Sequence, residues 1–258
     1  MIAAIKQEAI TNNSFSGDRI LVIKNLYKAF NGYPVLVDFN LEVFTGESVV
    51  VLGKSGSGKS VLIKCIIGLL EPDSGTIELL GENVADLDHE GLDKIRAKAG
   101  FLFQSNALYD SMTVRDNLEF PLRRHWIEVT QPEIDAMVTE ALEDVGLAHT
   151  IDMMPAALSG GMRKRIALAR TLILKPDIIL YDEPTTGLDP MTGKEIIDLM
   201  MEIKKKYNTT SLIISHDMNV VKLASDRVVI LLEGRCYANG TYHELQQNPD
   251  LKVKQFFD

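Results

Sequence analysis

The residues best suited to chemistry in this sequence form one glycine-rich run, Gly53-Lys54-Ser55-Gly56-Ser57-Gly58-Lys59-Ser60. Its spacing fits G-x-x-x-x-G-K-[ST], a loop whose backbone amides surround phosphate groups. The apolar run Val49–Leu52 precedes it and a helical pattern follows from Lys59, which is the context that this motif requires. We therefore expect the loop, through Val61, to bind nucleotide phosphates, with Lys59 at the β- and γ-phosphates and Ser60 on Mg²⁺.

Two adjacent carboxylates, Asp182 and Glu183, end a second apolar run at Ile178–Tyr181. Parallel strands deliver their carboxyl ends to one edge of a sheet, where a phosphate loop also lies. We expect Asp182 to hold the Mg²⁺ shell and Glu183 to act as the general base that polarises the attacking water. Alone, the pair could be ordinary surface acids, but the upstream phosphate loop favours the catalytic interpretation.

One histidine, His216, follows a third apolar run at Ser211–Ser215. A neutral imidazole can accept a hydrogen bond from water or donate one to a γ-phosphate. The alternative is a histidine at a strand end with only a structural hydrogen bond. We predict a catalytic role for His216, together with Lys59 and Glu183.

Around these residues the sequence predicts an α/β fold, a P-loop NTPase with a mostly parallel core sheet. Residues 20–48 predict an antiparallel β subdomain around a hairpin at Asn31-Gly32, and residues 107–158 are mostly helical. A capping box at Thr130–Glu133 predicts the start of one of these helices. We expect a flexible leader over residues 1–17 and a single domain over 18–258, with an inserted α-helical subdomain at about 107–160.

Composition narrows the classes of partner. The chain has 258 residues, a net charge of −9 and two cysteines without metal-ligand spacing. The acidic balance argues against nucleic acid as the partner. No apolar stretch reaches the roughly 18 residues of a membrane span, and the leader does not read as a signal peptide. A role at a membrane would therefore need a separate membrane-embedded partner.

A further segment is Leu158-Ser159-Gly160-Gly161-Met162. With it, the motifs resemble the ATP-binding cassette of ABC transporters over about residues 21–258. The resemblance implies that Phe30 stacks on adenine, that Gln104 contacts Mg²⁺ and senses a membrane partner, and that Asp189 lies in the D-loop at the nucleotide. The implied cofactors are ATP and Mg²⁺, with the metal bound by Ser60, Gln104 and Asp182.

The same resemblance implies partners. Ser159, Gly160 and Gly161 would contact the ATP of a facing cassette, so two copies would form an ATP-dependent homodimer on an integral membrane permease. Lys54 stands where the family usually has proline, and Met162 where it has glutamine. We expect little loss from either, because glycines, Lys59 and backbone amides make the nucleotide contacts.

Three segments resemble more narrowly the ATPases of bacterial Mce-associated (Mla-type) phospholipid transport systems: LSGGMRKR, GKSVLIK and FQSNALYDSMTVRDNLEFPL. That resemblance implies a peripheral protein on the cytoplasmic face of the inner membrane, driving lipid transport with a lipid-binding Mce-type protein. The alternatives are a cassette for a small-solute importer and a soluble ATPase of the iron–sulfur assembly type. A chromosome-maintenance ATPase fits less well, because residues 60–157 contain no sustained heptads and no cysteine pairs.

Overall fold

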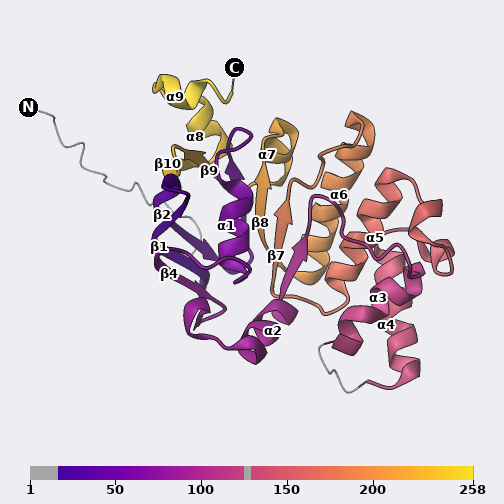
Figure 1. The fold of residues 1–258 in the computed structure, drawn as a ribbon. Helices are drawn as coiled ribbons and strands as arrows, with labels where there is room; N and C mark the ends of the chain where they lie inside the picture. The colour runs from indigo at the N-terminus through magenta and orange to yellow at the C-terminus, as the bar shows by residue number, and fades with distance from the viewer. Residues whose placement is uncertain (1–16, 125–128, 258) are drawn as a thin grey trace, which may run out of the picture.

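The structure is a computed structural model, and it describes residues 17–124 and 129–257 (Figure 1). The predicted leader, apart from Gly17, lies outside the described residues. The strands are β1 (Arg19–Phe30), β2 (Tyr33–Phe44), β3 (Ser48–Leu52), β4 (Ser74–Leu79), β5 (Glu82–Asn83), β6 (Ala99–Leu102), β7 (Ile178–Asp182), β8 (Thr210–Ser215), β9 (Arg227–Leu232) and β10 (Arg235–Gly240). The helices are α1 (Lys59–Ile66), α2 (His89–Lys98), α3 (Val114–Arg124), α4 (Gln131–Asp144), α5 (Gly160–Leu172), α6 (Pro190–Tyr207), α7 (Met218–Ala224), α8 (Tyr242–Gln246) and α9 (Leu251–Lys254).

The larger sheet has six strands in the order β10-β9-β3-β8-β7-β6. Its pairs are parallel from β9 to β6, and β10 joins the edge antiparallel to β9. Every residue of β3, β7 and β8 is buried, which explains why these strands read as continuous apolar runs. The predicted mostly parallel core sheet is confirmed.

The smaller sheet is antiparallel, with four strands in the order β2-β1-β4-β5. Its β1–β2 hairpin turns at Asn31 and Gly32, whose φ angles of 49° and 80° are both positive. A two-residue turn of this kind needs positive φ at both positions, which Asn-Gly accepts at little cost. The hairpin was predicted, and it brings the start of β2 towards the phosphate loop.

The core has two parts, one on each face of the larger sheet. In β3, Val49 and Val51 pack into the part that includes α1 and the smaller sheet, while Val50 and Leu52 pack into the part that includes α5, α6 and α7. Side chains alternate along a strand with period two, so one apolar strand supplies both layers. The sheet is thereby fixed between two packed layers, and its strand ends form a rigid edge.

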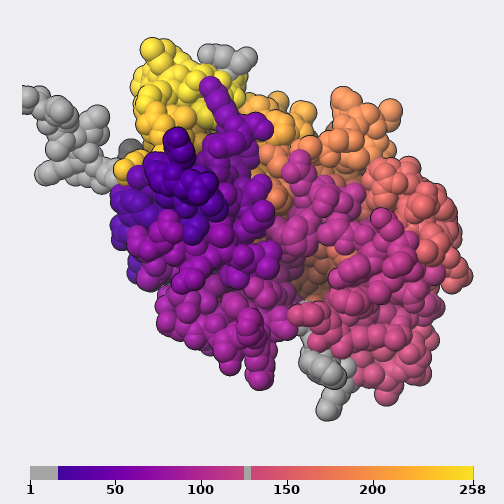
Figure 2. Space-filling view, viewed as in Figure 1, coloured from indigo at the N-terminus to yellow at the C-terminus, as the bar shows by residue number. Residues whose placement is uncertain are grey.

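The helical part consists of α3, α4 and α5, which contact one another and lie at one side of the molecule (Figure 1). The space-filling view shows the same segments as a compact magenta and rose lobe beside the indigo and violet β1–α1 region (Figure 2). Helix α4 begins at the predicted capping box, in which Glu133 accepts hydrogen bonds from the Thr130 backbone and hydroxyl. Across the two described stretches, we find no helix that is both long and apolar enough to span a bilayer.

Candidate nucleotide site

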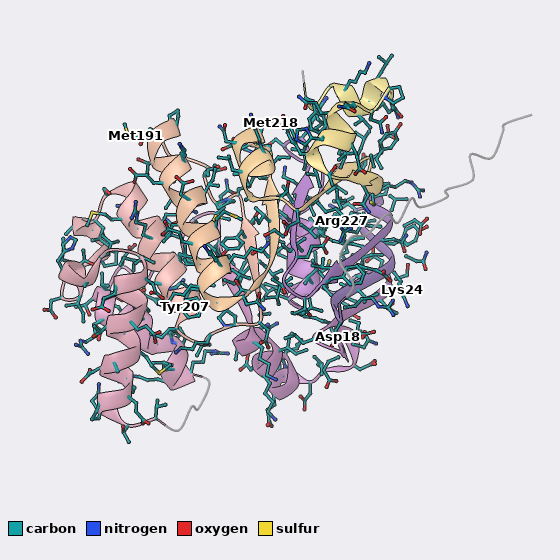
Figure 3. All side chains as sticks on the ribbon, turned by 180° about the vertical axis from the view of Figure 1, so that it is seen from behind. Asp18, Lys24, Met191, Tyr207, Met218 and Arg227 are labelled. Atoms are coloured by element: carbon teal, nitrogen blue, oxygen red, sulfur yellow. The ribbon has the colours of Figure 1, made fainter. Side chains whose placement is uncertain are left out.

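The predicted site residues follow neighbouring strands of the larger sheet. Gly53 follows β3, His216 follows β8, Asp182 ends β7 and Gln104 lies two residues after β6. These four strands are consecutive in the sheet and parallel, so their carboxyl ends meet at one edge. Figure 3 shows this edge from behind: the labelled Met191 and Met218, near the starts of α6 and α7, lie at the same side of the molecule.

Lys59 bends back across the phosphate loop. Its side chain is 6% exposed, and its ammonium donates hydrogen bonds to the carbonyl oxygens of Gly53 (2.7 Å) and Lys54 (3.1 Å). The same nitrogen lies 3.3 Å from Oε1 of Glu183. A buried ammonium of this kind is ready to exchange its carboxylate partner for a phosphate.

The residues predicted to hold Mg²⁺ are partly brought together. The Ser60 hydroxyl donates to Oδ1 of Asp182 at 3.2 Å. Burial raises the pKa of the Asp182 carboxyl, the Ser60 hydrogen bond opposes this, and the neighbouring Glu183 adds to the rise. A buried carboxylate with a raised pKa gains when a cation binds beside it.

The donor set fits Mg²⁺. In the described residues, no three His, Cys, Asp or Glu side chains gather into a metal cluster. A hydroxyl and one carboxylate are the few protein ligands that Mg²⁺ takes when phosphates and water complete its octahedron. Ser60 and Asp182 could therefore hold the ion only together with a phosphate ligand.

Glu183 lies between two candidate catalytic groups. Its carboxylate contacts Lys59 through Oε1, and its Oε2 lies 2.8 Å from Nδ1 of His216. The residue is 7% exposed, has φ of 49°, and donates its backbone N–H to the carbonyl of Ile214 at 2.9 Å. A left-handed conformation at a glutamate is uncommon and is often found at functional sites. The backbone thus holds this carboxylate at the strand edge.

Asp217 supports this edge, although the sequence analysis gave it no role. Its Oδ2 accepts a hydrogen bond from the Thr185 hydroxyl at 2.9 Å, and its Oδ1 accepts from the Asn219 backbone at 2.8 Å. The first bond joins the loop after β7 to the loop after β8, and the second caps α7. The available signal was an aspartate immediately before a helical run, which is typical of an N-cap.

The phosphate loop needs glycine where it meets β2. Gly58 has φ of 101°, and a Cβ added there would lie 2.8 Å from Cγ1 of Val35. The β1–β2 hairpin therefore packs directly on the loop. At the tip of this hairpin Phe30 lies opposite Tyr33 in the strand register and is 42% exposed. The Phe30 ring is thus accessible at the hairpin tip, and its stacking on adenine stays a prediction.

Lys54, which differs from the residue expected at this position of the loop, contacts the C-terminal segment, and the sequence gave no sign of this contact. Its ammonium donates to Oε1 of Gln255 at 3.0 Å and lies 5.8 Å from the centre of the Phe256 ring. Its carbonyl accepts hydrogen bonds from the Lys59 ammonium and the Ser57 N–H, both at 3.1 Å. Lys54 thus connects the C-terminal segment to the phosphate loop.

A second group of predicted residues lies apart from the first. Ser159 caps α5 by accepting the Met162 N–H at 3.2 Å, and Asp189 caps α6 by accepting the N–H groups of Met191 and Thr192. Both caps border a pocket of about 440 Å³ lined by Leu147, Ser159–Met162, Arg165, Gly187–Asp189, Thr192 and Glu195. Among the described residues, its lining includes none of the phosphate loop. The residues predicted to act on a facing copy therefore lie apart from the phosphate loop within one chain.

The ABC transporter family model matches residues 36–186, more than half of the chain. A Haemophilus influenzae protein, "Intermembrane phospholipid transport system ATP-binding protein MlaF", is 37% identical over 92% of this chain and 89% of its own length. A Mycobacterium leprae protein, "Probable ribonucleotide transport ATP-binding protein mkl", is 39% identical over 92% of this chain and 68% of its own length.

A solved structure has the same fold. It is a dimeric post-hydrolysis state of the ATP-binding cassette MJ0796 bound to ADP and Pi. Its TM-score is 0.78 and its sequence is 32% identical, with 86% of this chain and 98% of that chain covered. That cassette is thus a dimer bound to the products of ATP hydrolysis.

Proposed function

The chain belongs to the ABC transporter family, and from that premise we propose that it is the ATP-hydrolysing subunit of a transporter that moves phospholipid or another lipid between bacterial membranes. It is an ATPase, and its dimeric structural relative supports a homodimer as the working unit. The observation that carries the proposal is the separation of the two half-sites: Lys59, Asp182 and Glu183 at the strand edge, and Ser159 with Asp189 at the pocket between α5 and α6.

In the proposed mechanism, the γ-phosphate of ATP takes the place of Glu183 at the Lys59 ammonium. The released carboxylate then accepts a proton from the attacking water, and His216 orients either that water or the phosphate. Ser60, Asp182 and, by resemblance, Gln104 would hold Mg²⁺, which would neutralise charge on the phosphate oxygens. Ser159, Gly160 and Gly161 of a facing copy close over the phosphate and complete the site.

The lipid assignment rests on the relatives. The name of the H. influenzae protein refers to intermembrane phospholipid transport, whereas that of the M. leprae protein refers to ribonucleotide transport. We favour lipid because LSGGMRKR and the segment after Gln104 resemble the Mla-type ATPases. We place the chain at the cytoplasmic face of the inner membrane, bound to an integral membrane permease that works with a lipid-binding Mce-type protein.

The shared site is tested by mixing two inactive chains. Lys59→Ala removes the phosphate contact, and Ser159→Ala removes the contact made to the facing copy. A mixture should recover part of the wild-type ATPase activity, because one of the two sites in a mixed dimer keeps both halves. A mixture that stays as inactive as its components at every ratio would refute the shared site.

The transported molecule is tested in vesicles. The chain would be purified with the membrane protein that co-purifies with it in detergent and reconstituted into liposomes with fluorescent phospholipid. We expect ATP-dependent phospholipid transfer, absent when the chain carries Glu183→Gln. ATPase activity stimulated by ribonucleotides and indifferent to phospholipid would assign the transporter to another substrate.

A further inference from the structure

Helix α5 begins at the signature segment (Leu158–Met162) and carries a buried lysine one turn further along. The Lys164 side chain is 2% exposed. Its ammonium donates hydrogen bonds to the carbonyl oxygens of Phe103 (3.3 Å) and Gln104 (3.0 Å). The helix that carries one half-site therefore holds the backbone at Gln104, a residue expected in the other half-site.

A second cation of α5 extends this contact along the same loop. The Arg170 guanidinium donates to the carbonyl oxygens of Ala107 (2.8 Å) and Asn106 (3.2 Å) and lies 5.8 Å from the centre of the Tyr109 ring. Lys164 and Arg170 together bind most of the carbonyls between residues 103 and 107. Hydrogen bonds from α5 thus hold the loop after β6 at both of its ends.

The loop does not hold this conformation by local preference. Asn106 and Ala107 have φ angles of 66° and 52°, and alanine is disfavoured in the left-handed region. The Asn106 side-chain oxygen is buried without a hydrogen-bond donor. Strained backbone persists only where surrounding contacts determine it, and here Arg170 of α5 supplies such contacts, together with Asn117 of α3 at Tyr109.

Burying an ammonium costs desolvation free energy, so it is an unfavourable way to hold a loop in place. Within the described ranges, no carboxylate forms a salt bridge with the Lys164 ammonium, although the charge of Asp182 favours its charged form from a greater distance. A neutral side chain would avoid the desolvation cost, so what the cation adds at this position is its two hydrogen bonds to the loop carbonyls.

We propose that Lys164 is a positioning residue that links the signature end of α5 to Gln104, so that docking of Ser159 on a facing copy's nucleotide sets the position of Gln104 at the chain's own Mg²⁺. The inference rests on the proposed function. It means that the two ATP sites of a dimer communicate within each chain, through a helix held to a loop by two hydrogen bonds. Cooperativity between the sites then depends on Lys164.

The test compares Lys164→Met with Lys164→Arg, because methionine keeps the length without the charge and arginine keeps the charge. Lys205→Met, on an exposed lysine of α6, is the matched control. We expect the Hill coefficient for ATP to fall from about 2 to about 1 in Lys164→Met. The Mg²⁺ concentration for half-maximal activity should rise roughly tenfold in that variant, as when a ligand's supporting partner is lost. Lys164→Arg and Lys205→Met should behave like the wild type.

A double-mutant cycle separates this role from general damage. In a Gln104→Ala background, Lys164→Met should cause no further rise in the Mg²⁺ requirement, because Lys164 acts on the ion only through the Gln104 side chain, which alanine lacks. A wild-type Hill coefficient and Mg²⁺ requirement in Lys164→Met would overturn the inference while leaving the proposed function intact. Wild-type chain without ATPase activity would instead defeat the proposed function.

A second variant keeps the test usable if the first one does not fold. If Lys164→Met does not give a folded chain by circular dichroism, Lys164→Gln takes its place, because the shorter amide cannot reach both carbonyls. A wild-type Hill coefficient in Lys164→Gln would then overturn the inference.

Discussion

The ammonium of Lys59 lies 3.3 Å from a carboxylate oxygen of Glu183, and both side chains are more than nine-tenths buried. In this arrangement the group expected to bind the γ-phosphate neutralises the group expected to activate water. His216 contacts the other oxygen of the same carboxylate at 2.8 Å. In the proposed mechanism, nucleotide binding breaks this buried ion pair, which keeps the base engaged until the phosphate arrives.

The first prediction concerns Glu183→Gln. The change removes the general base, so kcat should fall roughly 10²–10⁴-fold. ATP affinity should be kept or increased, because glutamine no longer competes with phosphate for Lys59. Single-turnover hydrolysis and equilibrium binding of a fluorescent ATP analogue measure the two effects separately. Turnover near the wild-type rate would refute the role of Glu183, and Glu202→Gln, on the exposed surface of α6 away from the pocket, is the control.

The second prediction concerns Asp182→Asn without nucleotide. Burial and the nearby Glu183 both raise the pKa of Asp182, so its ionised form is a cost to the nucleotide-free fold. Asparagine can still accept the hydrogen bond from Ser60. We expect a higher unfolding temperature, measured by calorimetry, and a loss of at least about tenfold in Mg²⁺-dependent ATP binding. An unchanged Mg²⁺ dependence would remove Asp182 from the metal shell.

The third prediction concerns the contact between Lys54 and the C-terminal segment. Lys54→Met and Gln255→Ala should each raise the KM for ATP about two- to threefold, because an exposed hydrogen bond of this kind contributes little energy. The double variant should have the same KM for ATP as Lys54→Met alone, since both changes break one contact. Gln246→Ala, on α8, is the control. Fully additive effects would show that Gln255 acts independently of Lys54.

Much of the fold was predictable because its signals are local. The buried strands β3, β7 and β8 are continuous apolar runs, and the hairpin at Asn31-Gly32 has a turn that few other dipeptides adopt. The start of β6 has no local signal, because Ala99 and Gly100 give no apolar pattern. A Cβ on Gly100 would lie 2.7 Å from Cγ2 of Thr171, so tertiary packing, not strand propensity, selects that residue.

The candidate site likewise contains residues that local sequence motifs identify and residues that only the folded chain brings together. Lys59, Asp182 and Glu183 lie in motifs whose spacing identifies them, and the structure places them together. Their roles with ATP and Mg²⁺ stay predictions. The contact between Lys54 and Gln255 joins residues 201 positions apart, so no local pattern could reveal it. The sequence analysis gave Lys164 no role, although its spacing to Ala167 and Leu168 places it on the buried face of α5.

The last prediction uses the two glycines of the signature segment as a matched pair. A Cβ on Gly160 would lie 3.8 Å from Cδ2 of Leu188, an ordinary contact, whereas a Cβ on Gly161 would lie 2.6 Å from Cγ2 of Thr192. Gly160→Ala should therefore fold as well as the wild type and yet lose ATPase activity, because the new methyl group faces the nucleotide of the facing copy. Gly161→Ala should instead lose about 1–3 kcal/mol of stability through overpacking.

The double variant Gly161→Ala/Thr192→Ser separates the two causes. Serine removes the clashing methyl group and keeps the hydroxyl that donates to Asp189 at 2.6 Å. Stability measured by urea unfolding should return in this variant, because the steric conflict lies within the chain. No change within the chain should rescue Gly160→Ala, since its conflict arises only when two copies close on ATP. Full activity in Gly160→Ala would mean that the start of α5 does not approach a nucleotide closely.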